Sequence, residues 1–119
     1  MRRQSLKLIP CIAVGLLSAC AGQLGAGVDA FHNADHARAL AAFTDVEPSQ
    51  LSVDEYARYA LYRGLTHLAL GDLSEAQHHL AACKALVDEH RDGLTLDERL
   101  RLRQAWLSMG LMPRQAPPR

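Results

Sequence analysis

The chain has 119 residues, which is enough for one domain, and its 13 basic residues are balanced by 13 acidic ones. This balance provides no basic surplus of the kind that nucleic-acid-binding domains carry. Apolar residues make up 49% of the chain but aromatic residues only 5%, and Ala and Leu dominate the apolar set. That composition favours an all-α fold packed through small side chains over a β-sandwich.

The first 19 residues have the pattern of a secretory leader. Basic residues precede an apolar run from Leu8 to Leu17, which is too short to span a bilayer as a permanent helix. The run ends in Leu17-Ser18-Ala19-Cys20, which resembles the cleavage site of bacterial lipoproteins. The resemblance implies cleavage before Cys20 and acylation of its thiol. The alternative is ordinary secretion with an unmodified Cys20.

The lipoprotein resemblance also implies a location. Acyl chains on Cys20 would hold the protein on a membrane of the cell envelope, facing the periplasm. Ala21 follows the cysteine, where an Asp would resemble an inner-membrane retention signal, so the outer membrane is favoured. Residues 20–28 are expected to form a flexible tether, residues 29–110 the helical domain, and residues 111–119 a loose, proline-rich tail.

Four helices are predicted between the tether and the tail. The first runs from Asp29, as N-cap, to about Phe43, and ends before Pro48. The second begins after a capping box, Ser52-x-x-Glu55, and covers Val53 to Leu70.

The last two helices have similar start signals. Ser74-x-x-Gln77 is read as a capping box for a helix that ends near His90, with Gly93 as its stop. Thr95-x-x-Glu98 is read as the box for a helix that reaches about Met109 and stops at Gly110.

The segment from Ala60 to Ala85 contains two helical patterns that meet at Gly71-Asp72. Small residues at Gly64 and Ala76 would let the two helices approach closely as an antiparallel pair. This segment resembles the tetratricopeptide repeat, a family of helix hairpins that bind proteins.

The repeat resemblance also shows departures: Leu73 replaces the usual aromatic residue, Cys83 the usual Ala, and Asp88 stands where the family prefers Pro. Because adjacent segments align with single helices of this pair, with Ala37 matching Ala76, the chain reads as a half, a whole and a half repeat. The alternative is a four-helix array in which this register is accidental. Either array is short, so association with a protein partner or a second copy is expected.

Histidines are the first candidates for chemistry, because the chain has six. His32 and His36 are spaced i, i+4, as two metal ligands on one helix could be, but no third ligand stands at a recognisable spacing. Solvated histidines are therefore favoured, His67 is expected in the core or in a groove, and no metal site is predicted. Phosphate loops, nucleophile elbows and paired carboxylates are also missing from the sequence, so we expect no enzyme and no cofactor.

Three residues are predicted to contact a protein partner: Tyr59, Arg63 and Trp106. Tyr and Arg anchor many protein interfaces, although Tyr59 could equally pack in the core, and Trp106 could fold back onto the preceding helix. The predicted function is a lipid-anchored adaptor or scaffold for an envelope assembly such as a secretion, pilus or cell-wall machine. The alternative is a small lipoprotein that binds a metal or an apolar ligand. Cys83 is expected to be a buried, unpaired thiol.

Overall fold

The computed structural model describes residues 22–110, and the chain divides into two compact units after Leu51. All regular structure in the described residues is helical, which confirms the all-α fold class. No helix within residues 22–110 is both long enough and apolar enough to cross a membrane. The predicted leader, Cys20 and the tail at 111–119 lie outside the described residues.

The first unit contains two helices where one was predicted. A helix over residues 22–32 is followed by a turn at 33–35, then by α2 (His36–Thr44) and a 3-10 helix, η1 (Pro48–Gln50). The prediction of one helix from Asp29 to Phe43 is therefore wrong. The first helix closes on Ala34, which has φ +59°, through bonds from the Ala34 and Asp35 amides to the carbonyls of Phe31 and Ala30.

Two further predictions fail in this unit. Asp35, not Asp29, caps a helix, since its side chain accepts a hydrogen bond from the Arg38 amide. The expected tether is helical from residue 22 onward. Packing explains why three glycines do not prevent this helix: Gly27 lies so close to the ring of Phe43 that no Cβ would fit between them.

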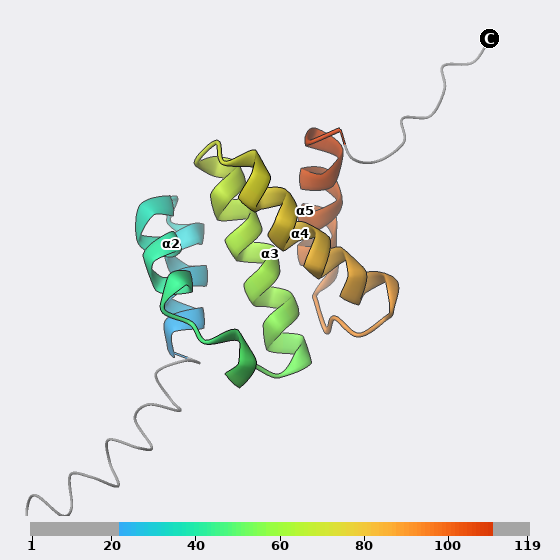
Figure 1. Cartoon of the computed structure of the whole chain (residues 1–119), viewed down its shortest axis with the longest axis horizontal. Coiled ribbons are helices and arrows are strands. Elements are labelled where there is room, and N and C mark those ends of the chain that lie inside the picture. The colour runs from blue at the N-terminus through green and yellow to red at the C-terminus, as the bar shows by residue number, and fades with distance from the viewer. Residues whose placement is uncertain (1–21, 111–119) are drawn as a thin grey trace, which may run out of the picture. The chain divides into compact units, whose positions relative to one another are not determined.

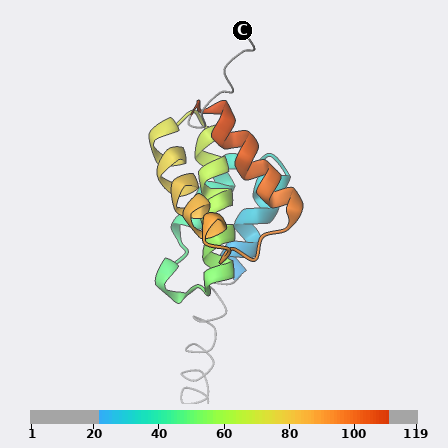
Figure 2. The ribbon, with the colours of Figure 1, turned by 90° about the vertical axis from the view of Figure 1, so that its right-hand side faces the viewer.

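The second unit is built from three helices: α3 (Val53–Ala69), α4 (Leu73–Asp88) and α5 (Leu96–Ser108). Each of the three contacts the other two. α4 runs back along α3, and α5 then runs in the same general direction as α3 (Figures 1 and 2). Two of the three predicted capping boxes, Ser52–Glu55 and Thr95–Glu98, form as predicted.

The α3–α4 hairpin has the close helix approach that the sequence predicts. A Cβ on Gly64 would lie 2.6 Å from Cγ of Leu80, and Ala76 is fully buried. Gly71, with φ +83°, ends α3, and the side chain of Asp72 then accepts from the Glu75 amide. Asp72 is therefore the N-cap of α4, and the capping box predicted at Ser74 is wrong.

The connection from α4 to α5 also differs from its prediction. α4 ends at Asp88, and His90, with φ +57°, takes the left-handed position that ends the helix. Gly93 lies further along the loop, with φ +60°, and a Cβ there would meet the carboxylate of Asp54. Asp92 is buried in this loop and accepts hydrogen bonds from the Leu94 amide and the Arg99 guanidinium.

The proposed internal repeat does not extend to the first unit. Its alignment matches Ala37 with Ala76, but Ala37 is exposed and Ala76 is fully buried. The aligned segment is also two helices rather than one. The correspondence at the other end is closer, because Gly71 and Gly110 both end a helix with positive φ.

Candidate functional site

α5 presents leucines to solvent along one side. Leu96, Leu100 and Leu107 are 73%, 55% and 49% exposed, and their spacing at i, i+4 and i+11 places them on one face of the helix. We call these three residues the leucine stripe. The opposite side of α5 is buried through Leu102 and Ala105. α5 therefore has apolar residues on the side that packs against the unit and on the side that does not.

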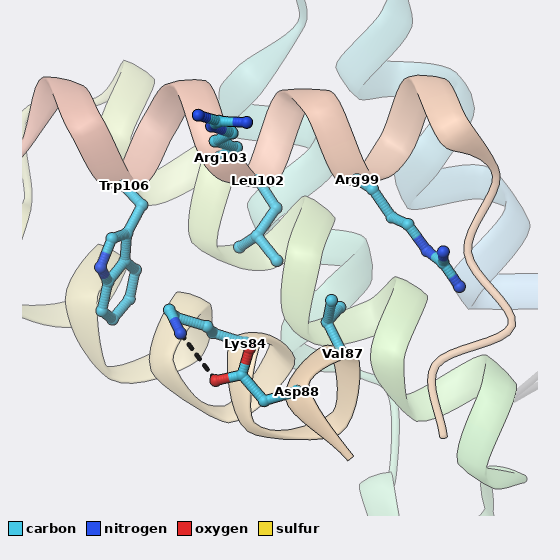
Figure 3. Close-up of a pocket in the computed structure, with 7 residues that line it drawn as sticks. All are labelled: Lys84, Val87, Asp88, Arg99, Leu102, Arg103 and Trp106. Atoms are coloured by element: carbon cyan, nitrogen blue, oxygen red, sulfur yellow. Dashed lines mark hydrogen bonds and ion pairs between the residues drawn. The ribbon is translucent and has the colours of Figure 1, made fainter. Parts of the chain in front are cut away.

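A groove of about 280 Å³ lies between α4 and α5, next to the leucine stripe. Figure 3 shows Trp106 and Leu102 pointing from α5 toward Lys84 and Val87 of α4. The Lys84 ammonium lies 6.0 Å from the centroid of the Trp106 ring, at the limit of a cation–π contact. The groove thus has an apolar floor and an aromatic wall, and its full lining is Lys84, Val87, Asp88, Arg99, Leu102, Arg103 and Trp106.

Cations outnumber anions around the groove. Lys84 pairs with Asp88 at 2.6 Å, and Arg99 pairs with the buried Asp92 at 2.9 Å. Arg103 has no ion pair within residues 22–110. The groove therefore offers a free positive charge to a bound molecule.

A buried carboxylate fixes α5 on the helix hairpin. Glu98 is 6% exposed, accepts hydrogen bonds from Nε and Nη2 of Arg58 at 3.2 and 3.4 Å, and accepts another from the Thr95 amide. Burial by itself would raise the pKa of Glu98, but the Thr95 amide, Arg58 and Tyr62 together hold that pKa below its ordinary value. The charged carboxylate consequently joins α3 to α5 and holds the leucine stripe on a fixed support.

Tyr59 is buried, as one of its two sequence-based readings predicts, and Arg63 is half-buried beside it. Tyr59 is only 3% exposed, and its hydroxyl accepts a hydrogen bond from the Arg63 guanidinium. Neither residue lines the groove that contains Trp106. Tyr59 is thus a core residue, because its ring is buried inside the unit and its hydroxyl finds a hydrogen-bond partner there.

Three potential metal ligands meet at the turn of the α3–α4 hairpin. His67 comes from α3, and Glu75 and His79 from α4, with one ligand atom of each lying within 4.8 Å of the others. The two imidazoles stack with centroids 5.5 Å apart and an angle of 5°. Burial and the nearby Arg63 lower the pKa of His67, and they lower the pKa of His79 to about 4.

The sequence-based search for metal ligands missed this cluster because it looked along single helices. Glu75 and His79 are spaced i, i+4, which was a usable signal, but His67 joins them only through the hairpin. The pair singled out from the sequence, His32 and His36, is divided by the turn at 33–35. Within residues 22–110, the structure brings at least three possible metal ligands together at one place, the cluster at the hairpin turn.

Cys83 is a fully buried thiol, as predicted. Burial, with Asp92 and Glu98 nearby, raises the pKa of this thiol to about 12, so it stays protonated at neutral pH.

Comparison of the chain with protein-family models, with curated proteins and with solved structures finds no match.

Proposed function

We propose that the protein is a lipid-anchored helical adaptor that binds another envelope protein through α5. The observation that carries the proposal is the leucine stripe, an apolar helix face without a neighbour in its unit. Exposed apolar patches of this kind mark protein-binding surfaces more often than isolated exposed leucines do. The hairpin formed by α3 and α4 adds support, since it has the small-residue contact that made this segment resemble a protein-binding repeat.

The surface can supply useful binding energy. Fully burying one leucine contributes about 1.5–3 kcal/mol, and the three leucines of the stripe are each roughly half exposed or more. Covering them would contribute on the order of 3–5 kcal/mol before the costs of association. Trp106 in the adjacent groove adds a residue type that dominates many interfaces.

The charges around the groove indicate what kind of partner fits. An amphipathic helix with acidic residues beside its apolar face would place leucines on the stripe and a carboxylate near Arg103. A second copy of this chain is disfavoured because it would bring the same cations together. The chain's own C-terminal segment is disfavoured for the same reason, since it carries Arg114 and Arg119 and no acidic residue.

The lipoprotein-like leader supports the location. Acylation at Cys20 would place the helices close to the membrane, and Ala21 favours the outer membrane with the protein facing the periplasm. We propose a binding role without catalysis. The partner class is an acidic, apolar helical segment of an envelope assembly such as a secretion, pilus or cell-wall machine.

Site-specific photo-crosslinking in intact cells tests the proposal. A photoreactive amino acid at Leu100 should give one discrete adduct. The cross-linked partner peptide should have apolar residues at helical spacing and be rich in acidic residues. The same group at Gln77, an exposed position on α4, is the matched control and should give none.

A charge substitution gives the second arm of this experiment. Leu107→Glu should abolish the adduct at Leu100, whereas Gln77→Glu, at the exposed control position on α4 away from the stripe, should retain it. Adducts only between two copies of the chain, or equal adducts at Gln77, would contradict the proposal.

A further inference from the structure

We propose that His67, Glu75 and His79 form a binding site for one zinc ion at the turn of the α3–α4 hairpin. The three side chains come from two helices and bring two imidazole nitrogens and one carboxylate oxygen within 4.8 Å of one another. None of the three lines the groove or belongs to the leucine stripe. The inference is therefore independent of the proposed function.

His67 provides the strongest single observation. Its side chain is buried, with 7% of the residue exposed, and Nε2 has no hydrogen-bond partner among residues 22–110. Buried polar atoms are nearly always paired, so an orphaned nitrogen on an imidazole that belongs to a three-ligand cluster indicates a missing partner. A metal ion accepting the lone pair of Nε2 would satisfy it.

Asp72 is placed to orient His67. One carboxylate oxygen of Asp72 lies 3.7 Å from Nδ1 of His67, on the other side of the ring from Nε2. Ligating histidines usually direct their second ring nitrogen to a carboxylate or carbonyl, which fixes the tautomer that exposes the ligating lone pair. Because Asp72 also caps α4, the residue that starts this helix lies beside the proposed ligand on the preceding one.

The ligand set suits zinc. Two imidazoles and a carboxylate form a three-ligand set that zinc uses where a fourth position stays open for water or another ligand. Nε2 of His79 already lies 3.6 Å from a carboxylate oxygen of Glu75, one helical turn away. Since metal–ligand bonds are about 2.0–2.2 Å, a small rotation of the half-exposed Glu75 side chain would bring its oxygen to the distance that a shared ion needs.

The surrounding charges permit a divalent cation. Arg63 acts on both imidazoles and opposes a metal ion. Two carboxylates, those of Asp72 and Glu75, face the same histidines and outnumber this single guanidinium. The cluster is therefore net negative when both imidazoles are neutral, which is the form that binds metal.

Calorimetric titration of the full-length chain with zinc chloride, in mild detergent, tests this site. The unmodified protein should bind one equivalent of zinc. His79→Ala and Glu75→Gln should each weaken binding at least about tenfold, because each removes one of three ligands. His78→Ala is the matched control, since His78 adjoins His79 on α4 but is exposed and outside the cluster, and it should leave the affinity unchanged.

These variants keep the test clear of folding defects, because His79 and Glu75 are more exposed than His67. Circular dichroism should show the same helix content for all of them. Titration with Co²⁺ gives a second readout, and the unmodified chain should develop the visible absorption of four-coordinate Co²⁺ while His79→Ala should not. Failure of the unmodified chain to bind zinc, equal binding by His79→Ala, or an equal loss in His78→Ala would each overturn the proposal.

Discussion

The contact between Gly64 and Leu80 makes a quantitative test of how α3 and α4 pack. A Cβ at position 64 would lie 2.6 and 2.7 Å from Cγ and Cδ2 of Leu80, and 3.2 Å from its backbone nitrogen. Leu80 is fully buried, so its side chain can move only against the atoms packed around it. Gly64→Ala must therefore push the two helices apart or displace Leu80 from its rotamer.

Two opposing effects set the size of the change. Replacing Gly by Ala inside a helix gains about 1 kcal/mol of helix propensity. Forcing an extra methyl group into a packed core costs about 1–3 kcal/mol, and the backbone contact places this site in the upper half of that range. The net destabilisation should be about 1–2 kcal/mol, which lowers the unfolding temperature of a domain of this size by roughly 5–15 °C.

Thermal unfolding followed by far-UV circular dichroism measures this change. Gly25→Ala is the matched control, because Gly25 lies in the helix over 22–32 with nothing within 4 Å of its Cβ position. It should raise stability by up to about 1 kcal/mol. In a Leu80→Ala background, the penalty of Gly64→Ala should largely disappear, since the clashing side chain is gone. A Gly64→Ala protein as stable as the Gly25→Ala protein would refute the close packing of this hairpin.

Three further outcomes are expected. Because the pKa of Glu98 and that of Asp92 are held below their ordinary values of 4.5 and 3.8, their stabilisation is present at neutral pH and should be lost as the pH falls through that range and below. Urea midpoints measured from pH 7 to pH 3 should show this loss. Glu98→Gln should lower the free energy of unfolding by about 2 kcal/mol at pH 7 and make it depend less on pH. An unchanged pH dependence in that variant would contradict the stabilising role of the charged Glu98. Alkylation of Cys83 by iodoacetamide, followed by peptide mass spectrometry, should be much slower in the folded protein than in urea, whereas equal rates would show that the thiol is not protected. Cell fractionation of Cys20→Ser should move the protein out of the membrane fraction, and its retention there would contradict the lipid anchor.

Local signals in the sequence were sufficient to predict most of the second unit. The capping boxes at Ser52 and Thr95 form because a side chain and a backbone amide three residues apart can satisfy each other without help from distant residues. The same reasoning was wrong at Ser74, because Asp72 is also a good cap and begins the helix earlier. When two caps compete, packing of the hairpin decides between them, and the pattern alone does not contain that information.

The first unit was harder to predict for a related reason. Apolar residues recur at helical spacing through Ala34, so the pattern reads as one helix, but the chain turns there with Ala34 in a left-handed conformation. Alanine disfavours that conformation, so no sequence signal marked the turn. The glycines before it suggested a tether, yet Gly27 lies close against Phe43, which was predicted to end the single helix from Asp29.

The candidate sites could be predicted only in part. Trp106 was correctly expected on the last helix, at a position that faces either the preceding helix or a partner, and it lines the groove between α4 and α5. The leucine stripe was not predicted. α5 has apolar residues on two faces, and their spacing alone does not indicate which face packs against another helix. The cluster at His67 depends on pairing two helices, and a search along one helix does not detect it.

The groove contains the only tryptophan of the chain. Intrinsic fluorescence excited at that indole therefore comes from one known place, between α4 and α5. A molecule that closes over the ring should shift its emission to the blue, whereas detachment of α5 should shift it to the red. The protein thus carries its own optical reporter where its partner is proposed to dock, and no label has to be attached to read it.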